Sequence, residues 1–193
     1  MTIHKIANQA KPGHLNFQFR VALVALALLL IGCDILNQIP QLPQTGTQSQ
    51  RQTPLKPAQS ATTAQMEAAV YQQINAIRRQ KGLTELKQNP KLAQVARDYS
   101  RRMAEQQFFA HTSPQGDTMV QRVRSANIFY TLLGENLFTS TNIPQPVPAA
   151  VQGWMDSQGH RENILRSEFR ETGIGVWRIE NTYYFTQLFL RSL

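Results

Sequence analysis

The chain has 193 residues, 41% of them hydrophobic, which is enough for one folded domain with appended segments. Its formal net charge of +8 would suit a nucleic-acid partner, but the basic residues are scattered apart from short clusters such as Arg78-Arg79 and Arg101-Arg102. The single cysteine, Cys33, excludes an internal disulfide. We expect no nucleic-acid partner, because the N-terminus carries the features of an exported protein.

Residues 1–32 have the pattern of an export signal. Lys5, Lys11 and Arg20 precede an unbroken apolar run from Val21 to Ile31. This run is shorter than the ~20 residues that an α-helix needs to span a bilayer. A basic segment followed by a short apolar one is typical of a signal peptide.

The apolar run ends in L-I-G-C, which resembles the lipobox of bacterial lipoproteins. The resemblance implies cleavage after Gly32 and a lipid on Cys33, so the chain would be an exported lipoprotein, anchored on the periplasmic or cell-surface side of a bacterial membrane. An uncleaved anchor and an ordinary signal peptide are the alternatives. Residues 33–62 are rich in Gln, Pro, Thr and Ser and lack apolar periodicity, which predicts a disordered tether.

Residues 63–193 are predicted to form the folded domain, which is helical in its first two thirds. The expected helices cover about residues 63–82, 90–107, 118–126 and 146–157. Each has one apolar face at helical spacing. The residues of these faces are, in order, Met66, Val70, Ile74 and Ile77; Leu92, Val95, Tyr99 and Met103; Met119 and Val123; and Val147, Val151 and Trp154. Asn89-Pro90 favours the start of the second helix, with Asn as the N-cap.

The C-terminal part changes to a strand pattern. Gly173–Ile179 and Thr182–Leu190 are short, rich in β-branched and aromatic residues, and joined by Glu180-Asn181, which predicts a β-hairpin. Both tryptophans, Trp154 and Trp177, are expected in the core. Helices followed by strands indicate an α+β fold.

Three polar motifs interrupt these elements, and we expect each in a loop. They are H-T-S-P-Q-G-D (His111–Asp117), L-G-E-N-L-F (Leu133–Phe138) and G-W-M-D-S-Q-G-H-R-E-N-I-L (Gly153–Leu165). Glu135 lies between apolar residues that would draw it inward, and a buried carboxylate needs a partner. His111, Glu135 and His160 form a site if the fold brings the three motifs together.

Each of these residues also has a purely structural interpretation. A histidine near a helix end can bond the last carbonyl groups or interact with the helix dipole. Glu135 could accept backbone N–H groups. Ser113 and Ser157 are turn residues, and neither lies in a G-x-S-x-G nucleophile elbow. Because the sequence has no H-E-x-x-H motif and no cysteine pair, spacing alone leaves the function open.

The motifs in this order resemble the bacterial branch of the CAP superfamily, named for cysteine-rich secretory proteins, antigen 5 and plant pathogenesis-related proteins. The likeness covers about Met66 to Leu190 and includes G-I-G-V and Y-Y-F-T-Q-L-F in the predicted hairpin. It implies a three-layer α-β-α sandwich with a central antiparallel sheet. A third strand is then expected near residues 127–133.

The resemblance also implies a shared cleft of two histidines and two acids, which holds a divalent metal in some members. His111 and Glu135 match that pattern. Two positions depart from the eukaryotic pattern, because Ser157 replaces an acid and Tyr184 replaces a histidine, while the bacterial G-H-R motif supplies His160. We therefore expect His111, Glu135 and His160 to line one cleft, with Ser157 and Tyr184 at its edge.

Three hypotheses about function follow. Two imidazoles and a carboxylate could hold Zn²⁺ or another divalent metal and activate water, which would make the protein a metal-dependent hydrolase or peptidase. The same groups could instead bond one another without a metal, in a module that binds a lipid, a cell-wall component or a protein partner. We favour this binding module because of the export signal, the tether and a polar cleft that lacks a complete catalytic set. No nucleophile with an activating base is evident, which argues against a serine or cysteine hydrolase. The third hypothesis is a structural domain without a ligand.

Overall fold

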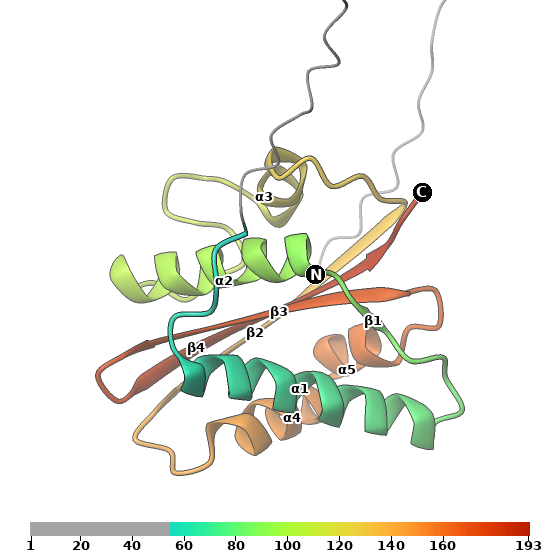
Figure 1. Ribbon diagram of the computed structural model, residues 1–193, viewed down its shortest axis with the longest axis horizontal. Helices are drawn as coiled ribbons and strands as arrows, with labels where there is room; N and C mark the ends of the chain where they lie inside the picture. Colours follow the sequence, from blue (N-terminus) through green and yellow to red (C-terminus); the bar gives the residue numbers. More distant parts are fainter. Residues whose placement is uncertain (1–54) are drawn as a thin grey trace, which may run out of the picture. The chain divides into compact units, whose positions relative to one another are not determined.

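The computed structural model describes residues 55–193, so the predicted signal (1–32), Cys33 and the tether up to residue 54 lie outside the described residues. In chain order the elements are α1 (Ala61–Gln80), β1 (Lys87–Gln88), α2 (Pro90–Glu105), α3 (Met119–Ser125), β2 (Leu132–Thr141), α4 (Pro146–Asp156), α5 (Gln158–Leu165), β3 (Glu171–Ile179) and β4 (Thr182–Arg191). They form a three-layer sandwich (Figure 1), with α2 and α3 on one face of the sheet and α1, α4 and α5 on the other. The fold is α+β, as predicted.

The domain begins before the predicted boundary at Thr63. Ser60 caps α1, because its side chain accepts from the backbone N–H of Thr63 while the Thr63 side chain accepts in return. Upstream of the cap, Gln59 Nε2 donates to the Arg178 carbonyl at 2.9 Å. The last residues assigned to the tether therefore belong to the folded domain.

The sheet has the order β1-β3-β4-β2. The antiparallel arrangement predicted for it is present between β2 and β4 and between β3 and β4, whereas β1 pairs with β3 in parallel over two residues. The predicted hairpin is confirmed. The predicted third strand was placed too early, because β2 begins only at Leu132 and contains the whole G-E-N motif.

Residues on β4 alternate between the two helical layers. Leu188 and Leu190 pack with α2, whereas Phe185 and Phe189 pack with the layer of α1 and α4. Because Glu135 pairs with Leu188 on β4, its side chain faces α2 and α3. The next residue on β2 faces the other layer.

Helix α2 lies very close to β3, and two glycines allow it. A Cβ on Gly173 would lie 2.3 Å from the backbone nitrogen of Ala93, and one on Gly175 would lie 2.0 Å from that of Arg97. The four residues predicted for the inner face of α2 are all buried: Leu92, Val95, Tyr99 and Met103. This contact fixes α2, and with it the start of the loop that carries His111.

The motif from Gly153 to Leu165 is helical on both sides of Ser157. Helix α4 ends at Asp156 and α5 follows at once, so His160 lies in a helix and not in the predicted loop. Trp154 is fully buried, as predicted. The prediction for Trp177 was wrong, since it is only half-buried near the end of β3, with the Arg101 guanidinium 5.9 Å from its ring centroid.

Candidate functional site

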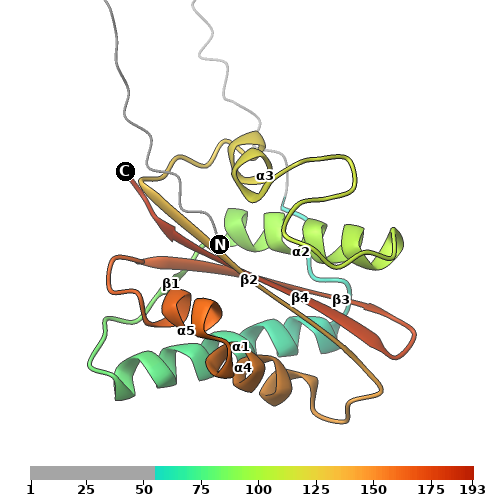
Figure 2. The same ribbon diagram turned by 180° about the vertical axis from the view of Figure 1, so that it is seen from behind.

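The candidate site lies at the free edge of β2, which is the last strand of the sheet. The loop that carries His111 approaches this edge from the α2 and α3 side. Helix α5, with His160, packs on the opposite face (Figure 2). The two imidazole rings meet at the edge, with centroids 6.4 Å apart and planes tilted by 49°. The structure therefore brings together His111, Glu135 and His160 from a loop, a strand and a helix.

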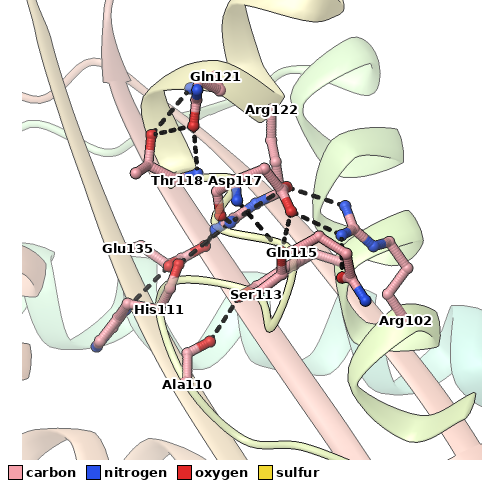
Figure 3. Close-up of polar contacts among 11 residues, drawn as sticks. Arg102, Ala110, His111, Ser113, Gln115, Asp117, Thr118, Gln121, Arg122 and Glu135 are labelled. Carbon is pink, nitrogen blue, oxygen red and sulfur yellow. Dashed lines mark hydrogen bonds and ion pairs between the residues drawn. The ribbon is translucent and has the colours of Figure 1, made fainter. Parts of the chain in front are cut away.

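Glu135 is the direct partner of His111. Its side chain is only 2% exposed, and its Oε1 lies 2.9 Å from His111 Nδ1. An ionised carboxylate can only accept a hydrogen bond, so Nδ1 carries the proton. In the neutral imidazole, Nε2 is then a free acceptor. Figure 3 shows the far side of the His111 ring pointing away from the carboxylate, and the His111 side chain is 59% exposed.

Arg122 from α3 holds the other oxygen of Glu135, with Nη2 2.7 Å from Oε2. Its Nη1 donates to the backbone carbonyl of His111 at 3.1 Å and to that of Asp117 at 3.2 Å. The guanidinium carbon lies 3.3 Å from the ring centroid of Tyr99, which is a close cation–π contact. Arg122 thus ties the Glu135 carboxylate to the backbone of the His111 loop (Figure 3).

A second acid, Asp117, holds the loop that carries His111 in place. Arg102 donates to both of its carboxylate oxygens, at 2.7 and 2.9 Å, and the Ser113 hydroxyl donates to it as well. The Arg102 hydrogen bonds, followed by the one from Ser113, lower the pKa of Asp117 to about 2. Burial raises the pKa of Tyr99 to about 12, and its hydroxyl donates to the Ala110 carbonyl at 2.6 Å. These contacts fix the backbone on both sides of His111.

On the other face of the sheet, two buried asparagines connect β2 to α5. Asn136 Nδ2 donates to the His160 carbonyl at 3.1 Å, and Asn163 Nδ2 donates to Asn136 Oδ1 at 2.9 Å. Asn136 is fully buried and Asn163 nearly so. Burial lowers the pKa of His160, and so does repulsion from the His111 ring when that ring is protonated. His160 is therefore held near β2 in a setting that favours its neutral form.

The other two predicted residues make no hydrogen bond to the site in residues 55–193. Ser157 occupies the junction of α4 and α5, where its side chain makes no capping hydrogen bond. Tyr184 pairs with Thr139 on β2 and packs beside Leu137 in the small core below α2. No hydrogen bond joins either side chain to the two histidines within residues 55–193. Their placement at the edge of a cleft stays a prediction.

The three predicted metal ligands do not fit a metal centre as they stand. Both oxygens of Glu135 are already bonded, one to His111 and one to Arg122, and His111 Nδ1 is used in the first of these bonds. Within the described part of the chain, no group of three or more His, Cys, Asp or Glu residues is arranged to hold an ion. We therefore derive no chemical step through Zn²⁺ or any other metal.

Comparison with known proteins identifies the family. The profile of the cysteine-rich secretory protein family, CAP, matches residues 71–189. The chain belongs to the CAP family. It is 36% identical over 124 residues to the uncharacterised protein YkwD of Bacillus subtilis, covering 64% of this chain and 46% of that protein. Against two curated relatives, the chain spans only 46% and 34% of their length.

Solved CAP structures from other bacteria have the same fold. An extracellular protein with an SCP domain from Bacillus anthracis is 33% identical, with a TM-score of 0.59 over 72% of this chain and 45% of that one. A cysteine-rich secretory protein from Staphylococcus aureus is 25% identical, with a TM-score of 0.57 over 68% of this chain and 40% of that one. The chain is thus a CAP domain of the bacterial type.

Sequence reasoning missed the residues that hold the site in this CAP domain. Arg122 lies on a short helix between apolar positions and was assigned no role. Asn136 and Asn163 stand inside the quoted motifs, but neither was assigned a role. The G-E-N motif did contain a signal: on a strand, Glu135 and Asn136 must face opposite layers, so one motif can serve both histidines.

Proposed function

We propose that this CAP domain is a binding module of the bacterial envelope, with the surface around His111, Glu135 and His160 as its contact site. The observation that carries the proposal is the His111–Glu135 hydrogen bond, because it presents Nε2 of an exposed imidazole as an acceptor of fixed orientation. Arg122 is paired with Glu135 and Asp117 with Arg102, so these charges are not free to bind a ligand.

The chemistry of the site favours an uncharged polar ligand. A neutral imidazole acceptor binds hydroxyl and N–H donors. Both kinds of donor are abundant in cell-wall glycans and their attached peptides. A lipid headgroup or a protein surface would be recognised through the same donors, and these are the other outcomes of the test described below.

Export and anchoring are part of the proposal. The basic segment, apolar run and L-I-G-C motif of the N-terminus support a lipid on Cys33, and the B. anthracis relative is described as extracellular. None of the helices in residues 55–193 is both long and apolar enough to cross a membrane. A lipidated Cys33 would place the CAP domain within reach of the cell wall.

The test is retention of the purified full chain by insoluble peptidoglycan sacculi. We expect the wild-type protein to co-sediment with sacculi and His111→Ala to bind at least about tenfold more weakly, since it loses the oriented acceptor. Thr112→Ala, an exposed neighbour on the same loop, is the matched control and should bind like the wild type. Equal retention of His111→Ala and wild type would refute the proposal, and so would no retention by sacculi together with no capture of a lipid or a protein. Capture of a lipid or a protein instead would reassign the ligand.

The same hydrogen bond supports a second candidate, a hydrolase. A histidine oriented by a buried carboxylate has the arrangement of a general base, which needs an acceptor nitrogen directed at the substrate. Incubation of sacculi with the protein, followed by chromatography of the soluble fragments, tests this. Release of fragments by the wild type but not by His111→Ala would favour hydrolysis, and intact sacculi with retained protein would favour binding alone.

A further inference from the structure

The outer edge of β2 carries backbone N–H and C=O groups that do not bond to β4, and the register shows to which residues these groups belong. Asn142 N–H donates to the Asn181 carbonyl at 3.0 Å, one step beyond the last pair of β2 and β4. Bonded pairs alternate along an antiparallel ladder, so Asn136 is bonded to β4 while its two neighbours Glu135 and Leu137 point their backbone groups away from the sheet.

Side chains of the helices bond only half of these outward groups. Asn163 Nδ2 donates to the Glu135 carbonyl at 3.2 Å, and Trp154 Nε1 donates to the Leu137 carbonyl at 2.9 Å. No group within residues 55–193 accepts from the N–H of Glu135 or the N–H of Leu137. Both residues are buried, at 5% and 4% exposure. Buried backbone N–H groups are rarely left without a partner, so these two require one.

These two N–H groups lie on the stretch of β2 whose side chains hold both histidines. The side chain of Glu135 binds His111, and the side chain of Asn136, between the two, binds the backbone of His160. The edge thus offers two kinds of group within one small region: backbone N–H donors from β2 and an acceptor nitrogen on His111. A ligand that uses both must carry an acceptor and a donor side by side.

We propose that the β2 edge beside the histidines binds a secondary amide of the ligand, whose carbonyl oxygen accepts from the N–H of Glu135 or Leu137 and whose N–H donates to His111 Nε2. The inference rests on the proposed function and narrows it to amide-bearing envelope material. A secondary amide occurs both in the N-acetyl groups of cell-wall glycan and in the attached peptides. An extended amide beside a strand edge also repeats the pairing by which sheets bind peptides.

The test follows the backbone amide signals of the full chain, labelled with ¹⁵N, during titration with three probes. These are an N-acetylglucosamine tetramer, a glucose tetramer of the same linkage with hydroxyls in place of the acetamido groups, and an alanine tetrapeptide blocked at both ends. The Thr139 N–H, which lies on the same edge but further from the histidines, is the internal control.

We expect the Glu135 and Leu137 signals to move downfield with at least one amide-bearing probe, while Thr139 stays in place. The glucose tetramer should bind at least about tenfold more weakly, because it leaves a buried N–H unpaired. Comparison of the N-acetylglucosamine tetramer with the alanine tetrapeptide shows whether the amide comes from the glycan or from the peptide. Equal shifts with the glucose tetramer, or no shift of the two signals with any probe, would overturn the inference. If the sacculi still retain the protein despite this result, the proposed function stands. Loss of retention refutes that function separately.

Discussion

Arg122 and Glu135 form an ion pair with almost no contact to solvent: Nη2 lies 2.7 Å from Oε2, and the side chains are 6% and 2% exposed. Such a pair contributes little net stability, because burying two charges is costly. It does make each partner dependent on the other. The pair also joins α3 to β2, so its integrity decides where the His111 loop lies.

Replacement of Arg122 by Gln should therefore destabilise the domain strongly. The change leaves a buried carboxylate without its cation and removes the bonds to the carbonyls of His111 and Asp117, for which we expect a loss of about 3–5 kcal/mol. Urea unfolding measures it. Arg124→Gln, an exposed position on the same helix, should stay within about 0.5 kcal/mol of wild type. Similar losses for the two variants would show that the ion pair does not exist.

Glu135→Gln should invert the tautomer of His111. Arg122 can only donate, so it will bond the carbonyl oxygen of the new amide, and the NH₂ group will then face His111 Nδ1. Nδ1 must accept, and the proton moves to Nε2. Long-range ¹H–¹⁵N spectra distinguish the two tautomers directly. We expect Nδ1–H in the wild type and Nε2–H in the variant, together with loss of ligand binding. An unchanged tautomer would mean that Glu135 does not orient the ring.

The parts of the fold that the sequence predicted have long, regular patterns. The face of α2 repeats over about three turns, from Leu92 to Met103, and all four predicted residues are buried because helical periodicity and burial coincide there. Strand β1 has only two residues, which is too short for any pattern. Helix α5 was missed because Gly159 indicates a break, whereas the helix runs through it with only Ser157 between α4 and α5.

The three polar motifs raised the site as a possibility, and the resemblance turned it into an expectation. His111 and Glu135 were paired through the motifs of the family, and the structure places them in contact. Arg122 was not found, since its carboxylate partner belongs to a different element and no local spacing connects them. His160 was expected beside Glu135, but the hydrogen bond from Asn136 to its carbonyl was not found, because it depends on α5 crossing the opposite face of the sheet.

His160 should make stability depend on pH. Burial and the nearby His111 lower its pKa in the folded state, so the unfolded chain takes up this proton at a higher pH, near the usual ~6.5. The contribution of neutral His160 to the free energy of unfolding is complete above the pKa of the unfolded chain. It is lost as the pH falls through the pKa of the folded state. We expect the free energy of unfolding to decrease from about pH 7 to about pH 5. His160→Gln should flatten this slope in urea titrations, whereas Gln158→Ala, an exposed position two residues earlier on α5, should not. A slope unchanged by His160→Gln would assign the effect to other groups.

Gly175 should tolerate no side chain, because α2 lies against it. A Cβ there would meet the backbone nitrogen of Arg97 at 2.0 Å, and a helix backbone cannot yield as a flexible side chain can. We expect Gly175→Ala to cost at least about 2 kcal/mol in urea unfolding and to displace α2, with the His111 loop that follows it. Gly153→Ala is the matched control. Its Cβ would meet only the Phe138 ring, at 3.2 Å, and alanine favours the helix by up to about 1 kcal/mol. That variant should be close to wild type or more stable, and equal losses in both would contradict the close packing of α2 on β3.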